Sequence, residues 1–170
     1  SFTARRTWQP ILGRPDRWDA CTLDQKVREM MSRGVTLNPS GSVEARVEFG
    51  HYEWPTHAAL VAAASEADRA VAIGQLEPVP EDEASSGFVH PWCVVQQGDK
   101  WRLCHDCSVG LDPRMSPPPF LLPTPWDVRS SLKPGRVLMK YDLRDGFFHC
   151  PVEHASRKFL MVRHPITKRL

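Results

Sequence analysis

The chain has 170 residues, 22 Lys+Arg against 20 Asp+Glu, a formal net charge of +2 and 41% hydrophobic residues. This length and balance are typical of one globular domain and exclude a coiled coil, a disordered tail and a strongly basic nucleic-acid binder. The sixteen prolines are about twice the usual share of roughly 5%, so they exclude long uninterrupted helices and predict many irregular connections.

The sequence also indicates where the protein is located. No apolar run approaches the ~20 residues that span a bilayer, and the first residues lack the apolar core of a secretion signal. Five cysteines are an odd number at low density, which favours free thiols in a reducing compartment. We therefore expect an intracellular protein, cytoplasmic or nuclear, that is neither secreted nor bound to a membrane.

Residues 1–55 predict a loosely structured arm with one helix. The helix covers residues 22–31, where Thr22 can cap the first turn and Gly34 can end the last. Tryptophans are scattered through the arm among Arg, Pro and Gly: Trp8, Trp18 and Trp54. Such a segment can order against a partner, so we expect the arm to bind a protein or an RNA.

The middle of the chain predicts a helix followed by a β-hairpin. Residues 58–73 are rich in alanine and follow a Pro-Thr pair, which is typical of a helix start. Residues 88–96 and 101–106 have the pattern of two strands, with a turn at 97–100 between them. This arrangement places the basic residues Lys100 and Arg102 near the hairpin tip.

Cys104 and Cys107 form a CxxC pair within and after the second hairpin strand. The pair supplies two of the four ligands that structural zinc needs, and His90, Cys93 or His105 could complete a site. Because no second correctly spaced pair exists, zinc is not expected. A small zinc module around this pair is kept as an alternative interpretation.

The last third of the chain begins with a connection and leads to two carboxylates. Six prolines in residues 113–125 predict an extended segment, followed by a short helix at 126–132 and a buried apolar strand at 136–141. Asp142 and Asp145 follow this strand, where carboxylates can hold Mg²⁺ against a triphosphate. The alternative is structural: Asp142 caps the next turn and Asp145 lies in its first turn.

Residues 141–152 read Tyr-Asp-Leu-Arg-Asp-Gly-Phe-Phe-His-Cys-Pro-Val, which resembles the first catalytic motif of reverse transcriptases of retrotransposon type. Other segments are similar to further parts of this family, and they stand in the family's order. Residues 74–79 resemble the entry to the fingers, and 91–95 with 100–106 resemble the fingers hairpin. Residues 126–132 and 156–162 resemble the helix before and the strand after the catalytic motif.

The resemblance covers about residues 57–170 and implies an α+β fold. The fold expected is a partial right-hand polymerase, with a fingers hairpin, the first palm strands and helices, and an irregular or helical N-terminal arm. The implied division is an arm at 1–55, a fingers-like region at 56–136 and the start of the palm at 137–170.

The resemblance also implies roles for individual residues. Asp142 would ligate two Mg²⁺ ions, and the carbonyl of Leu143 would help to hold one of them. Backbone N–H groups from Asp145 through Gly146 to Phe147 would cradle the triphosphate. The ring of Phe147 would exclude a 2′-hydroxyl, which makes deoxynucleotides the implied substrate.

Two basic residues of the hairpin would contact the same triphosphate. Arg102 would grip it with its forked donors, and Lys100 is the only amine near the hairpin turn. Residues 129–170 carry ten Lys/Arg against three Asp/Glu, which is compatible with contacts to the backbone of a template–primer of RNA or DNA.

The implied function is RNA-directed DNA synthesis by two-metal nucleotidyl transfer, with Mg²⁺ as the cofactor of the complete polymerase. Such a site needs several carboxylates, yet no Asp-Asp dipeptide occurs in the sequence. We therefore expect an excerpt of a longer reverse transcriptase that is inactive by itself. The alternative is a non-catalytic module derived from such a polymerase and bound in a larger protein or ribonucleoprotein assembly.

Overall fold

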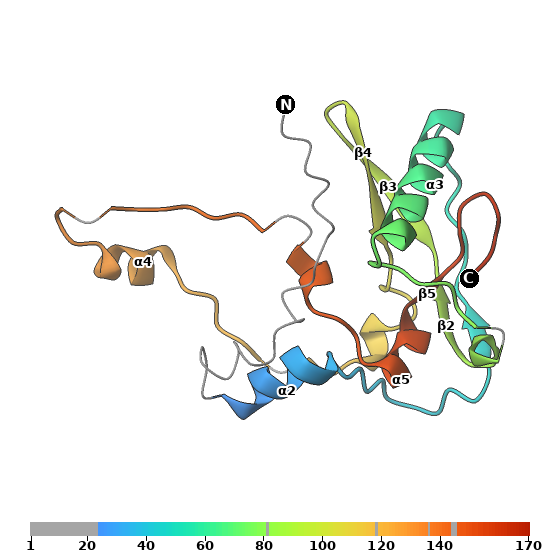
Figure 1. The fold of residues 1–170 in the computed structure, drawn as a ribbon, viewed down its shortest axis with the longest axis horizontal. Helices are drawn as coiled ribbons and strands as arrows, with labels where there is room; N and C mark the ends of the chain where they lie inside the picture. The colour runs from blue at the N-terminus through green and yellow to red at the C-terminus, as the bar shows by residue number, and fades with distance from the viewer. Residues whose placement is uncertain (1–23, 81, 118, 136, 144–145) are drawn as a thin grey trace.

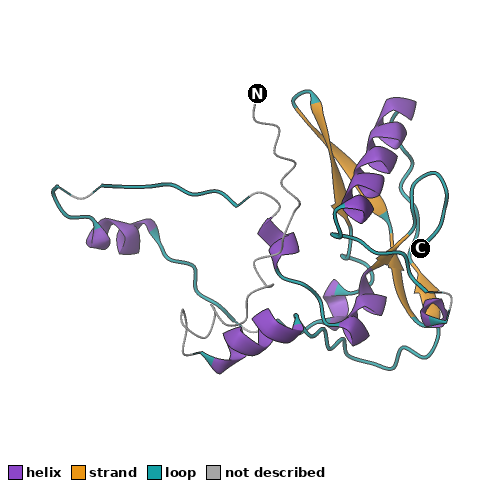
Figure 2. Cartoon of the chain, viewed as in Figure 1, coloured by secondary structure: helices purple, strands orange, loops and turns teal. Residues whose placement is uncertain are grey.

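The computed structural model describes residues 24–80, 82–117, 119–135, 137–143 and 146–170. The chain combines helices with two small sheets (Figures 1 and 2). Its α-helices and strands are α2 (Gln25–Arg33), β1 (Arg46–Glu48), α3 (His57–Ala72), β2 (Gly87–His90), β3 (Trp92–Gln97), β4 (Lys100–His105), α4 (Pro125–Ser131), α5 (His154–Arg157) and β5 (Met161–Val162). Short 3-10 turns are η2 (Glu83–Ser85), η3 (Asp112–Arg114), η4 (Gly146–His149) and η5 (Lys158–Leu160).

β2 is the central strand of a three-stranded parallel sheet with the order β1-β2-β5. All four residues of β2 are buried, as expected for a parallel strand that has neighbours on both sides. Phe88 and Val89 are only 1% and 2% exposed. The ring of Phe88 contacts those of Phe49 and Phe159, with centroids 5.7 and 5.6 Å away, so the core gathers segments from three parts of the chain.

The N-terminal arm is more ordered than predicted where it reaches the sheet. Residues 46–48 form β1 and pair with Gly87, Phe88 and Val89, and Phe49 continues into the core. The prediction of a loosely structured lead-in is therefore wrong for this part of the arm. Trp8 and Trp18 lie outside the described residues, and Trp54 is half-buried.

The two N-terminal helices form close to their predicted bounds. α2 begins after Asp24, whose carboxylate accepts hydrogen bonds from the N–H groups of Lys26 and Val27. The predicted cap, Thr22, lies outside the described residues, and Gly34 ends the helix as predicted. α3 is capped by the Thr56 side chain, which accepts from the Ala59 N–H, so Asx and hydroxyl caps set both helix starts.

The predicted hairpin forms, although its first strand is shorter than expected. β3 and β4 pair antiparallel from Trp92↔His105 to Gln97↔Lys100. The predicted strand at 88–96 is divided at Pro91, because proline has no N–H to donate to a ladder. As a result β2 joins the parallel sheet, and β3 belongs to the hairpin.

α3 packs against β4 through a face made of small side chains. The buried residues of this face are Ala59, Ala63, Ala64, Ala67 and Ala70. Because alanine side chains are short, the helix backbone can lie close to the hairpin (Figure 1).

α4 lies on a long excursion away from the sheets (Figures 1 and 2). The predicted helix is confirmed, and it starts with a reciprocal capping box between Thr124 and Asp127. The predicted strand that should follow is wrong: residues 137–143 form no strand, and Val137 and Tyr141 are 85% and 79% exposed. A buried strand needs neighbouring strands, and no described strand pairs with this segment.

The C-terminal segment is more helical than the resemblance implies. Residues 154–160 form α5 and η5, and the strand is limited to Met161 and Val162. A turn follows β5 and is closed by a hydrogen bond from the Lys168 N–H to the His164 carbonyl at 3.0 Å. None of the helices in the described ranges is long and apolar enough to cross a membrane.

Candidate functional site

The two basic residues predicted to contact a triphosphate lie together on the hairpin. Lys100 and Arg102 are both exposed, and they are two positions apart on β4, so their side chains share one face of the strand. Their partners in the ladder are Gln97 and Val95. This face is therefore a small, solvent-accessible basic surface near the hairpin turn.

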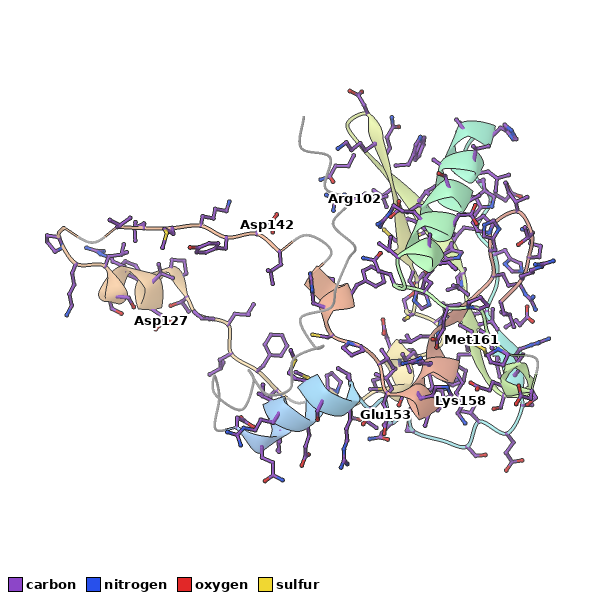
Figure 3. All side chains as sticks on the ribbon, in the orientation of Figure 1. Arg102, Asp127, Asp142, Glu153, Lys158 and Met161 are labelled. Atoms are coloured by element: carbon purple, nitrogen blue, oxygen red, sulfur yellow. The ribbon has the colours of Figure 1, made fainter. Side chains whose placement is uncertain are left out.

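The residues of the predicted catalytic motif lie elsewhere. Asp142 and Leu143 belong to the exposed segment 137–143, and Figure 3 shows Asp142 on the excursion and Arg102 on the hairpin. Gly146 and Phe147 begin η4, where Phe147 is 97% exposed. Asp145 lies outside the described residues. Within the described ranges no hydrogen bond or ion pair joins the hairpin to this motif.

The donor set that the described residues place around Asp142 does not fit a magnesium site. Mg²⁺ needs near-octahedral oxygen ligation, and a two-metal centre needs several carboxylates. Asp142 is not part of any group of three or more metal-ligating side chains in the described residues. Among the described residues, Asp142 therefore has no carboxylate partners with which to hold a metal ion.

A small cleft of about 220 Å³ lies beside the parallel sheet and was not predicted from the sequence. Aromatic side chains from the arm and the hairpin line it, together with basic ones from the C-terminal turn: Tyr52, Trp54, Trp92, Arg163 and Lys168. The Trp92 indole N–H donates to the Arg163 carbonyl at 3.0 Å. Among these lining residues the sequence pointed only to Trp54, because the cleft forms between segments about 110 residues apart.

The basic residues of this cleft already have partners within the protein. Arg163 donates from Nε to the Glu48 carboxylate at 3.0 Å and makes a second, shorter bond to it through its other nitrogen. The Arg163 hydrogen bond holds the pKa of Glu48 below its usual value. Lys168 donates from Nζ to the Pro165 carbonyl at 2.7 Å. The positive groups of the cleft are therefore bound to acceptors within the protein and are not left free to bind an anion.

A second cluster brings together His90, His105 and Cys107. Their ligand atoms all lie within 4.8 Å of one another, and they come from β2, from the last residue of β4 and from the turn that follows. Among the residues that the structure describes, no other group of three or more such side chains is found. The sequence pointed to Cys107 and offered both histidines as possible completions.

The side chains of the CxxC pair, Cys104 and Cys107, do not meet at one site. Cys104 lies directly opposite Cys93 in the hairpin ladder, on the strand face opposite to that of His105, because side chains alternate along a strand. Both are free thiols, and burial raises the pKa of Cys93. A zinc module built on Cys104 together with Cys107 is therefore not what the fold assembles.

Burial dominates the electrostatics of the His90, His105 and Cys107 cluster. It lowers the pKa of His90, opposed by a hydrogen bond to the Phe159 carbonyl. Burial also lowers the pKa of His105 to about 4 and raises the pKa of Cys107 to about 11. At neutral pH all three side chains are therefore uncharged, and both imidazoles present a lone pair.

Asp106, between two members of the cluster, orders the turn. Its carboxylate accepts hydrogen bonds from the Ser108 N–H at 2.9 Å and from the Tyr52 hydroxyl at 2.5 Å. Hydrogen bonds from the Ser108 side chain, the Tyr52 hydroxyl and the Ser108 N–H, in that order, lower the pKa of Asp106 to about 2. An ionised Asx turn thus sets the path of the chain from His105 to Cys107.

Comparison with protein-family models, with curated proteins and with solved structures finds no match for this chain.

Proposed function

We propose that this chain is part of a retroelement-type reverse transcriptase, in which it contributes the fingers hairpin and the first catalytic motif. The observation that carries this proposal is the order of the elements. α3, the β3–β4 hairpin with Lys100 and Arg102 at its tip, and the capped helix α4 precede the motif at residues 141–152.

The exposure of residues 137–143 supports the same proposal. Val137, Leu138 and Met139 are 85%, 71% and 72% exposed, although their sequence is that of a buried strand. A polymerase palm would cover these side chains with neighbouring strands, and the same strands would supply the carboxylates that Asp142 lacks here. Template–primer, deoxynucleotides and Mg²⁺ belong to that complete protein.

The test is primer extension by the natural polypeptide that contains these residues, on an RNA template with deoxynucleotides and Mg²⁺. Asp142→Asn is expected to lower the extension rate on the order of 100-fold or more, because it removes a charge that would act directly in the transition state. The matched control is Asp82→Asn, which should keep the wild-type rate. Asp82 is an exposed carboxylate that lies outside the motif at residues 141–152. Equal rates in all three proteins would overturn the assignment of Asp142.

The second candidate function is a non-catalytic module that binds a protein or RNA partner. The observation that favours it is the apolar surface around α4, where Phe120, Leu121 and Trp126 are 76%, 99% and 71% exposed. Absence of primer extension in the wild-type polypeptide, together with stable capture of one partner that Leu121→Ser weakens, would favour this module over the polymerase.

A further inference from the structure

We propose that His90, His105 and Cys107 bind a single Zn²⁺ ion through two imidazole nitrogens and one thiolate, with a water molecule as the fourth ligand. The proposal is independent of the polymerase proposal, because none of the three residues belongs to the predicted catalytic or nucleotide-binding set. The three ligands come from β2, β4 and the turn after β4, so the ion would join the parallel sheet to the hairpin.

His90 is the strongest part of the argument. It is only 2% exposed, and its Nε2 lies 2.9 Å from the carbonyl oxygen of Phe159. Since a carbonyl can only accept, Nε2 carries the proton and Nδ1 carries the lone pair. That Nδ1 is buried and makes no hydrogen bond of normal geometry, and the Asp106 backbone acts on the ring more weakly than the Phe159 carbonyl does. A buried polar atom in this position is costly unless it has another partner.

The same arrangement is typical of metal-binding histidines. A ligating imidazole usually donates its second ring N–H to a backbone carbonyl or a carboxylate, which sets the tautomer and orients the ring. Phe159 plays this part for His90. One ring nitrogen of His90 lies within 4.8 Å of the ligand atoms of His105 and Cys107. Nδ1 is the nitrogen that the Phe159 contact leaves for a metal.

The spacing of the other two ligands suits zinc. Cys107 Sγ lies 3.7 Å from His105 Nε2. Tetrahedral zinc with its usual bond lengths to nitrogen and sulfur places these two atoms about 3.6 Å apart. No two ligand atoms of the cluster are more than 4.8 Å apart. Small side-chain rotations that move these atoms by about 1 Å would therefore bring all three to bonding distance from one ion.

The rings are held in place by their surroundings. Phe49 stacks on His90 with centroids 5.4 Å apart, and Trp92 contacts the ring of His105 at 5.6 Å. Gly110 leaves room for His90, because a Cβ there would lie 2.4 Å from its Cε1. Ligands that are already oriented lose little conformational entropy on binding, which favours affinity.

The donor set selects zinc over magnesium. Imidazole and thiolate suit Zn²⁺, whereas Mg²⁺ prefers oxygen ligands. On binding, the Cys107 S–H bond breaks and an S–Zn bond forms, so one proton is released to solvent for each ion bound. No oxidation or reduction takes place.

The first experiment measures zinc binding to the 170-residue chain, freed of metal by chelation, by calorimetry and elemental analysis. We expect one Zn²⁺ per chain. Cobalt in place of zinc should give the visible bands of a tetrahedral site and a near-ultraviolet sulfur-to-cobalt charge-transfer band. A chain that binds no zinc at micromolar concentrations, or cobalt without a sulfur band, overturns the proposal.

The matched control uses the other cysteine of the CxxC pair. Cys107→Ser should lose the sulfur band and weaken zinc binding at least about tenfold, whereas Cys104→Ser should keep both, since Cys104 lies opposite Cys93. His105→Gln should weaken zinc binding and leave the circular dichroism of the chain unchanged. Equal losses in Cys104→Ser and Cys107→Ser would contradict the assigned ligands.

A further measurement needs no substitution. Alkylation of the wild-type chain, followed by mass spectrometry, reports each thiol separately. Zinc should slow the alkylation of Cys107 and leave the rate at Cys104 unchanged. Equal rates at Cys107 with and without zinc would show that the thiolate is not a ligand.

Discussion

At the scale of single residues, close backbone approaches decide several positions in this protein. Gly87 begins β2 with φ +110°, and a Cβ there would lie 2.1 Å from the carbonyl oxygen of Lys158. Gly34 has φ +97°, and a Cβ there would lie 2.7 Å from the N–H nitrogen of Glu153. Both glycines bring an earlier segment of the chain against residues 151–158, so they fix the position of the C-terminal elements.

Gly87→Ala is therefore expected to destabilise the fold by roughly 3 kcal/mol or more, because it adds a steric clash with backbone to an unfavourable φ. Gly41→Ala is the matched control: its φ is +88°, and nothing lies within 4 Å of the added Cβ. The control should cost only about 1 kcal/mol. Urea unfolding of both variants measures the difference, and equal losses would contradict the clash.

At the scale of elements, the alanine face of α3 shows how a simple pattern becomes a specific contact. The sequence predicted the helix because alanine favours helices and Thr56 can cap the first turn. It did not predict which face would be buried, since alanines occur almost all round the helix. The structure selects the face that includes Ala59 and Ala63, which are 0% and 2% exposed, because α3 lies on β4.

Ala63→Leu should lower the free energy of unfolding by about 1–3 kcal/mol, because three extra carbons must enter a closely packed face. Ala58→Leu lies on the exposed side of the same helix and should change it by less than about 0.5 kcal/mol. Thermal and urea unfolding report both values. If Ala63→Leu were as stable as Ala58→Leu, the contact between α3 and β4 would not be tight.

At the scale of the whole molecule, the excursion that carries α4 (Figure 3) exposes many large apolar side chains. Its large apolar side chains with more than two thirds of their surface exposed are Phe120, Leu121, Leu122, Trp126, Val137, Leu138, Met139 and Tyr141. Scattered exposed apolar residues are normal, but a run of them indicates an interaction surface. Under the two proposed functions, the strands of a polymerase palm or a separate partner would cover this surface.

We expect the isolated chain to bind a hydrophobic dye such as ANS through this surface and to self-associate at high concentration. Combined serine substitution of Leu121, Leu138 and Met139 should lower both effects while leaving the free energy of unfolding within about 0.5 kcal/mol per site. The control is Val109→Ser, which should leave dye binding and self-association unchanged, because Val109 is an exposed valine outside the excursion. Unchanged dye fluorescence and sedimentation in the triple variant would contradict this role.

The features that the sequence determined by itself are local. Helix α3, the end of α2 at Gly34, the hairpin turn and the helix at 125–131 depend on a few adjacent residues, whose caps and backbone preferences act over one turn. The motif at 141–152, which carries Asp142, is likewise a local pattern, and its role stays a prediction.

Tertiary structure alone decided which distant segments meet. Residues 46–48 joined β2 and residues 137–143 formed no strand, because strand pairing depends on neighbours that local sequence does not specify. The same holds for the His90, His105 and Cys107 cluster. The Nδ1 lone pair of His90 is left without a hydrogen bond because the Phe159 carbonyl, 69 residues away in the chain, accepts the proton on Nε2. Because His90 is buried, water cannot satisfy this lone pair, and leaving it unpaired costs free energy.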